Sequence, residues 1–276
     1  MNSFGVNVTL VENADHILPF EDSDITAVLH KRFTKNGINI LTNTKAVELS
    51  KSENGVSVKL ESQSKEKIIL ADKALVVFGR TPNTQGLGLQ EMGIKIDNRG
   101  FVGTEDYYQT NVKGIYAIGD ITKTPSLAHV ASTEGEIAVK HILGKAGEHK
   151  TVNPNLVPSA IYCEPQVAGF GLRERQIKDS GIKVKKSLFN YAGAGKTVAV
   201  GKTDGMVKVI CDAATDEILG AHIVGHNATE LIHEILLAKN AELLPQDIAE
   251  MIHAHPTISE TILEVMKGVN GKPIHS

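Results

Sequence analysis

A histidine and a glutamate five residues apart, His255 and Glu260, form the combination in this sequence best suited to chemistry. An imidazole titrates near neutral pH, so it can take a proton from a thiol. A neighbouring carboxylate would select one ring tautomer and stabilise the imidazolium that forms. Only Pro256 and the first turn of a predicted helix separate the two residues, so Glu260 can reach back toward the ring. The His255–Pro256 peptide bond is also a candidate for the cis form.

The same segment has a structural interpretation. Thr257 to Glu260 fits a capping box, with Thr257 as the N-cap and Glu260 as the third helical residue. A carboxylate has two oxygens, so both roles can coexist, and the residues alone leave the choice open. His253 and His255 could also be a metal pair, but no third ligand accompanies them at a suitable spacing. We therefore predict a packing or supporting role for His253 and no metal site.

Two other acids follow predicted strands. Glu12 ends the β-rich run Val6–Glu12, the position at which a βαβ unit reads the ribose hydroxyls of a nucleotide. Asp120 follows the apolar run Gly114–Ile118 and Gly119, where a glycine allows close approach of a ligand and a carboxylate can accept from a sugar hydroxyl. A surface glutamate and an ordinary Gly-Asp turn are the alternatives.

Three motifs place these residues in a family. Gly79–Thr84, Tyr116–Asp120 and His255-Pro256-Thr257 with Glu260 occur in the order found in the pyridine nucleotide–disulfide oxidoreductases, and the resemblance covers essentially the whole chain. It implies that FAD is bound by Asp120 and, largely through backbone groups, by a short downstream segment: Ser126, Leu127, Ala128 and His129. It implies NAD contacts by Glu12, Ala46 and Gly79.

Within this family the sequence is most similar to the dihydrolipoyl dehydrogenases. The segments that carry this similarity are Val8–Glu12, Gly220–Gly225 and His253–Thr257. The sequence departs from the pattern at His226, where the family usually has proline, and in the loop Tyr191–Val200.

That similarity implies oxidation of dihydrolipoyl groups by NAD through FAD and a redox disulfide. His255, polarised by Glu260, would deprotonate the substrate dithiol and serve the disulfide of the opposite subunit. A homodimer follows from this, with the lipoyl domain of the E2 component of a 2-oxoacid dehydrogenase complex as partner.

The first third of the chain must position Glu12. An amphipathic helix with Ile25, Leu29 and Phe33 on one face follows it, and Gly37 ends that helix. A hairpin turning at Asn54-Gly55 and a strand over Ala74–Phe78 complete residues 1–80, which we interpret as part of a Rossmann-type NAD-binding domain.

The remaining chain divides into two predicted parts. Residues 81–150, with a strand over Gly114–Ile118 and a helix over Ser132–Leu143, are interpreted as the returning segment of an FAD-binding domain. Residues 151–276 place five strands before three helices, the α+β pattern, and are interpreted as a dimerisation domain. The fold class is therefore α/β plus α+β.

Composition sets limits on function. A net charge of -3 and a pI near 6.4 give no support for a nucleic-acid or membrane partner. Cys163 and Cys211 lie in strand-like contexts and are interpreted as buried apolar residues. The absence of a disulfide framework favours a reducing compartment such as the cytoplasm or the mitochondrial matrix.

Gly193–Thr197 resembles a phosphate loop, but Asn190 stands where its first glycine should be and no helix is expected to follow.

The family's redox cysteines and NAD glycine motif are missing from this sequence, so we expect the chain alone to be inactive. A fragment of a glutathione-type sister reductase and a non-catalytic dimerisation module are the alternatives.

Overall fold

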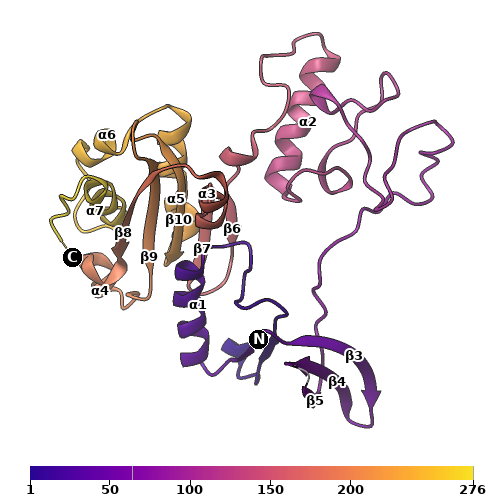
Figure 1. The fold of residues 1–276 in the computed structure, drawn as a ribbon, viewed down its shortest axis with the longest axis horizontal. Helices are drawn as coiled ribbons and strands as arrows, with labels where there is room; N and C mark the ends of the chain where they lie inside the picture. The colour runs from indigo at the N-terminus through magenta and orange to yellow at the C-terminus, as the bar shows by residue number, and fades with distance from the viewer. Residues whose placement is uncertain (64, 276) are drawn as a thin grey trace. The chain divides into compact units, whose positions relative to one another are not determined.

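The computed structural model describes residues 1–63 and 65–275 (Figure 1). The chain forms two compact units, one made of Met1–Leu75 with Pro158–Ser276 and the other of Val76–Val157. None of the helices in the described part of the chain has the length and apolarity that a membrane span requires.

A small βαβ arrangement begins the first unit. β1 (Thr9–Val11) pairs in parallel with β2 (Asn39–Leu41), and α1 (Ser23–Lys35) connects them. β3 (Lys45–Ser52), β4 (Gly55–Ser62) and β5 (Lys65–Ala71) then form an antiparallel sheet. The hairpin predicted at Asn54-Gly55 is confirmed. A side chain could not replace Gly55 here, because a Cβ would lie 2.3 Å from the carbonyl oxygen of Ala71.

The strand predicted over Ala74–Phe78 is wrong. These residues have no regular secondary structure, and Leu75 and Phe78 are each 83% exposed. An apolar run becomes a strand only where neighbouring strands accept and donate its backbone hydrogen bonds. No strand in the described part of the chain pairs with this run.

The C-terminal part of the first unit is an antiparallel sheet in the order β6-β7-β10-β9-β8. Its strands are β6 (Ser159–Ile161), β7 (Gln166–Gly171), β8 (Val184–Asn190), β9 (Met206–Asp212) and β10 (Ile218–Gly225). The helices that follow are α5 (Ala228–Asn240), α6 (Pro245–Glu250) and α7 (Glu260–Val269). These five strands followed by three helices agree with the prediction for residues 151–276. The sequence did not predict α3 (Glu174–Ser180) or α4 (Gly195–Ala199).

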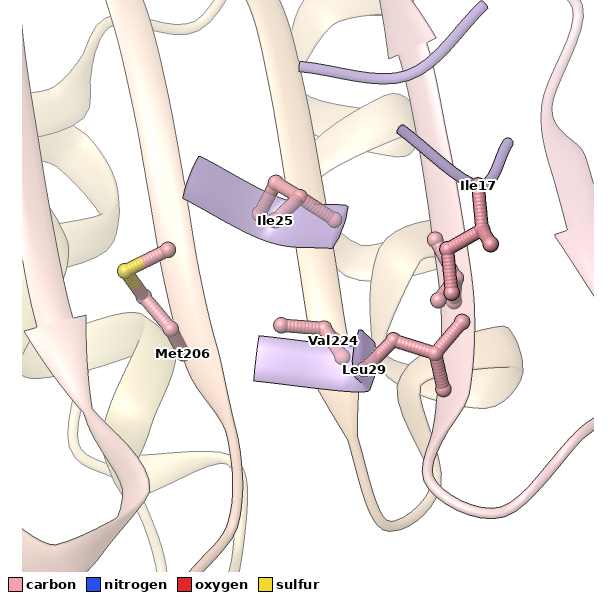
Figure 2. Close-up of a cluster of buried hydrophobic side chains, with 6 residues drawn as sticks. Ile17, Ile25, Leu29, Met206 and Val224 are labelled. Atoms are coloured by element: carbon pink, nitrogen blue, oxygen red, sulfur yellow. The ribbon is translucent and has the colours of Figure 1, made fainter. Parts of the chain in front are cut away.

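The two faces of this sheet have different partners. On one face, Ile25 and Leu29 of α1 pack with Ile17 against Met206 of β9 and Val224 of β10 (Figure 2). On the other face, α7 lies so close to β8 that a Cβ on Gly268 would come within 2.3 Å of Ser187 Oγ. The apolar face predicted for α1 is therefore confirmed.

A buried lysine joins the segment before α1 to the sheet. Lys208 is fully buried on β9, and its Nζ lies 2.8 Å from Asp22 Oδ2, 2.7 Å from Asp24 Oδ1 and 3.1 Å from Glu174 Oε1. Burial alone would lower the pKa of Lys208, but the hydrogen bonds that its ammonium donates to Asp22 and Asp24 raise the pKa above its usual value, so the amine stays charged.

The second unit contains one long helix, α2 (Ala128–Ile142), and a core around Ile94, Val102 and Ala117. The helix begins before the predicted Ser132. The strand predicted over Gly114–Ile118 is wrong, because Tyr116 makes only an isolated bridge with Gln109 and a 3-10 helix begins at Gly119.

The short 3-10 helices in the described part of the chain are Asn2–Phe4, Asp106–Tyr108, Gly119–Ile121, Pro154–Leu156 and Tyr191–Gly193.

Candidate active site

His255 and Glu260 are brought into contact. The Nδ1 atom of His255 lies 2.9 Å from Glu260 Oε1, so Nδ1–H donates to the carboxylate. The His255 side chain is 75% exposed, whereas Glu260 is 22% exposed. Within the described residues nothing bonds Nε2 of His255. The lone pair that could accept a proton therefore faces outward, while the opposite nitrogen is held.

Glu260 is held by its own helix start. Its second oxygen, Oε2, accepts the Thr257 N–H at 2.8 Å, which is one half of the predicted capping box. The other half is wrong: the Thr257 hydroxyl donates to the Ala254 carbonyl at 2.7 Å, and α7 begins at Glu260 with Ser259 before it. The His255–Pro256 peptide bond is cis, as predicted.

The carboxylate of Glu260 is kept ionised. Burial pushes the pKa of Glu260 upward, but the Thr257 N–H and the His255 ring together push it further downward, so it lies below its usual value. An ionised acceptor beside Nδ1–H stabilises a positive charge on the ring when Nε2 takes a proton.

His253 makes a separate pair with α5. Its Nε2 lies 2.9 Å from Glu234 Oε1, its Nδ1 lies 3.2 Å from the Met251 carbonyl oxygen, and its side chain is 2% exposed. These contacts tie the loop before His255 to α5. A packing or supporting role, as predicted, suits a ring that has both nitrogens engaged.

A third pair was not predicted. Glu264, one turn after Glu260 on α7, accepts from the ring of His275 at 3.0 Å and from the backbone N–H groups of Ile274 and His275. The four-residue spacing of Glu260 and Glu264 is visible in the sequence, but nothing there indicates that the tail returns to meet it.

The predicted FAD residues lie together in the second unit. Asp120 Oδ2 lies 2.8 Å from a guanidinium nitrogen of Arg80, which also donates to the Ser126 carbonyl at 3.3 Å. Leu127 and Ala128 are the N-cap and first residue of α2, and His129 follows in its first turn. The first N–H groups of a helix have no intrahelical acceptor and favour negatively polarised ligand atoms.

Glu134 is a buried acid beside this loop that the sequence reasoning missed. Its Oε2 accepts the Gly119 N–H at 2.7 Å, and the residue is fully buried. Its Oε1 is also buried and bonds to none of the described residues. The available signal was its spacing of four residues from Val130 and from Ala138, the other buried residues of α2.

The predicted NAD residues are divided between the two units. Glu12 follows β1, and its Oε1 accepts the Ala14 N–H at 2.8 Å. Ala46 is half-buried on β3 opposite Leu60. Gly79, in the second unit, has φ +127°, a backbone conformation that side chains rarely adopt.

The remaining candidates do not form sites. Cys211 is buried and Cys163 is half-buried, so the prediction of burial holds fully only for Cys211. Burial raises the pKa of the Cys163 thiol to about 11 and that of Cys211 to about 12, the opposite of an activated thiol. α4 covers Gly195–Ala199, so the expectation that no helix follows Thr197 is wrong for Val198 and Ala199, where the helix ends.

Comparisons with known proteins identify the family of the chain. The model of the pyridine nucleotide-disulphide oxidoreductases matches residues 1–135, and the model of the dimerisation domain of the same family matches residues 157–266. The chain belongs to this family. It carries the family's dimerisation domain, which supports a homodimer.

Its relatives share one name. Dihydrolipoyl dehydrogenases from Rhizobium etli and Geobacillus stearothermophilus are each 40% identical over 99% of this chain, and the one from Corynebacterium glutamicum is 37% identical over 100% of it. The chain spans only 57–59% of the length of these relatives.

Solved structures show the same fold. LpdA from Mycobacterium tuberculosis matches with a TM-score of 0.88 and 28% identity, covering 96% of this chain and 57% of LpdA. The HOCl-induced flavoprotein disulfide reductase RclA from Escherichia coli matches with a TM-score of 0.88 and 26% identity, covering 97% of this chain and 60% of RclA.

Proposed function

We propose that the full-length protein is a dihydrolipoyl dehydrogenase that oxidises dihydrolipoyl groups with NAD. The observation that carries this proposal is the His255–Glu260 pair, which leaves one ring nitrogen open to solvent and holds the other at 2.9 Å. The relatives that share 37–40% identity over nearly the whole chain support the choice of substrate.

In this proposal His255 is the general base. Its Nε2 takes the proton of a substrate thiol, and the resulting thiolate is the nucleophile toward a disulfide. Glu260 keeps Nδ1 protonated and stabilises the imidazolium, which gives its proton to the cysteine thiolate released when the disulfide opens. The second substrate thiol would then lose its own proton to His255 as it attacks the mixed disulfide and releases the product disulfide. Cys163 and Cys211, with raised thiol pKa values, are not the redox pair.

Asp120 and residues Ser126–His129 are proposed to hold FAD. Two observations fit a bound group: the Asp120 carboxylate is 49% exposed, and buried Oε1 of Glu134 has no partner among the described residues. Bound FAD would supply a two-electron acceptor. The chain's own contribution is to orient it: Arg80 holds Asp120, and Glu134 holds the backbone at Gly119.

Glu12, Ala46 and Gly79 are proposed to contact NAD. Glu12 would accept hydrogen bonds from ribose hydroxyls and disfavour a 2′-phosphate, which favours NAD over NADP.

We assign residues 1–80 to the NAD-binding domain, 81–150 to the FAD-binding domain and 151–276 to the dimerisation domain. The proposed partner is the lipoyl domain of an E2 component, and the cytoplasm is the proposed location because its relatives are bacterial.

A disulfide reductase with another substrate is the second candidate, and the likeness to RclA supports it. The test is to join this chain to its upstream sequence and compare two reactions: dihydrolipoamide with NAD, and NADPH with glutathione disulfide. We expect the first to dominate by at least about 100-fold, since specific recognition of a polar group discriminates by that much or more. Preference for the second would overturn the proposal.

A further inference from the structure

The C-terminal tail returns along α7 toward the candidate active site. The helix ends at Val269, and Gly271, with φ +70°, reverses the chain. The backbone N–H groups of Ile274 and His275 then donate to Glu264 Oε2 at 2.7 and 3.0 Å. Residues beyond the helix end are therefore held beside its second turn. Since the family match ends at residue 266, this tail lies outside it.

The side chain of His275 forms a second histidine–carboxylate pair beside the first. Its Nδ1 lies 3.0 Å from Glu264 Oε1; the histidine is 65% exposed and the carboxylate 5% exposed. Glu260 and Glu264 stand at i and i+4, so they share one face of α7 with their Cβ atoms about 5–6 Å apart. Each carboxylate binds one histidine through Nδ1 and at least one backbone N–H.

We propose that His275 and Glu264 are positioning residues that tune the proton affinity of the His255–Glu260 pair through their charges. The proposal rests on the proposed function of His255. A positive charge on His275 stabilises the Glu260 carboxylate and opposes a second positive charge on His255. The negative charge of Glu264 has the opposite effect on His255. The pKa of Glu260 is lowered partly by His275, which agrees with this coupling.

The charged groups on the elements that pack against α7 have partners of their own. α7 packs against β8, β9 and α6. Their ionisable groups, with their partners, are Lys185 with Asp216, Lys186 with Glu174, Lys208 with Asp22 and Asp24, Asp212 with its own turn, Asp247 with the Leu244 N–H, and Glu250 with Gln246. On α7 itself, Lys267 lies near the far end. His253 is bound to Glu234 on α5. Glu264 and His275 are thus the histidine–carboxylate pair nearest to Glu260 along α7.

The test is the pH dependence of kcat/KM for dihydrolipoamide in the full-length flavoprotein. H275Q should move the acid limb of the profile to higher pH, and E264Q should move it to lower pH. Each shift should be about 0.3–0.5 pH units, as for unit charges 6–8 Å apart near water. The double variant should return close to the wild type. K272Q, which removes a positive charge from the same tail, should move it less than H275Q does.

Shifts of H275Q and E264Q in the same direction, or an H275Q shift no larger than that of K272Q, would overturn the proposal. If E264Q does not fold, H275Q against K272Q still decides, because His275 is exposed. If the wild type does not oxidise dihydrolipoamide, the proposed function fails separately. NMR titration of the His255 ring in the same variants then tests the coupling, with the same expected signs.

Discussion

His253 and His255 stand two residues apart, and each lies 2.9 Å from a glutamate, yet the two pairs differ in what they leave open. His253 is bonded through both ring nitrogens and is 2% exposed. His255 is bonded through Nδ1 alone and is 75% exposed. A histidine acts as a base only through a nitrogen that has access to its substrate. The comparison assigns proton transfer to His255 and loop support to His253.

The largest expected effect is on turnover. Replacing His255 with Gln in the full-length flavoprotein should lower kcat for dihydrolipoamide oxidation by about 100- to 10,000-fold, the usual contribution of a general base. H253Q is the matched control, because the glutamine amide can still donate toward Glu234. We expect steady-state assays to show that H253Q keeps most of its activity. Equal losses in both variants would contradict the comparison.

The next effect is on stability. H253L removes the hydrogen bond between the His253 ring, whose side chain is 2% exposed, and the Glu234 carboxylate, which is 28% exposed. The loss of such a hydrogen bond costs about 0.5–1.5 kcal/mol. Urea unfolding should therefore show a lower midpoint for H253L than for H255Q. The exposed His255 should change the free energy of unfolding by less than about 0.5 kcal/mol. A larger loss for H255Q than for H253L would reverse the two assignments.

The smallest effect is the pH dependence contributed by Glu260. Its pKa in the folded protein lies below the ordinary value of 4.5. The stability that it contributes is therefore present above pH 4.5 and is lost as the pH falls through the lower folded pKa. The difference in unfolding free energy between wild type and E260Q should shrink as the pH falls below about 5. A difference that grows toward acid would show that the carboxylate is not stabilised as described.

The C-terminal half could be predicted well because its order is local. Three of the four strand pairings in its sheet join strands that are consecutive in the sequence, with β7–β10 the exception, and its helices carry clear periodic faces. The strand predicted over Ala74–Phe78 was wrong because an apolar run forms a strand only when another strand pairs with it. The strand predicted over Gly114–Ile118 was wrong for the same reason. Pairing of distant segments is what sequence patterns specify least.

In the site, sequence reasoning reached His255, Glu260 and His253, since they lie in one short segment. It could not predict the His275–Glu264 contact, which depends on how the tail folds back.

In the core, the sequence analysis missed the significance of Lys208. A lysine within the apolar run Met206–Cys211 needs acidic partners when it is buried. Two of its partners, Asp22 and Asp24, lie about 180 residues earlier, at the start of α1, and the third, Glu174, lies 34 residues earlier in α3. These distances are too large for a sequence pattern to reveal.

The most direct test of the account measures the two half-reactions of H255Q separately by stopped-flow absorbance of the flavin. Reduction of the enzyme by dihydrolipoamide should slow by at least about 100-fold, because it needs a base for the thiol proton. Reduction by NADH should stay within a few-fold of the wild type, because no thiol is deprotonated. Equal slowing with both reductants, or no slowing with dihydrolipoamide, would contradict the assignment of His255 as the base.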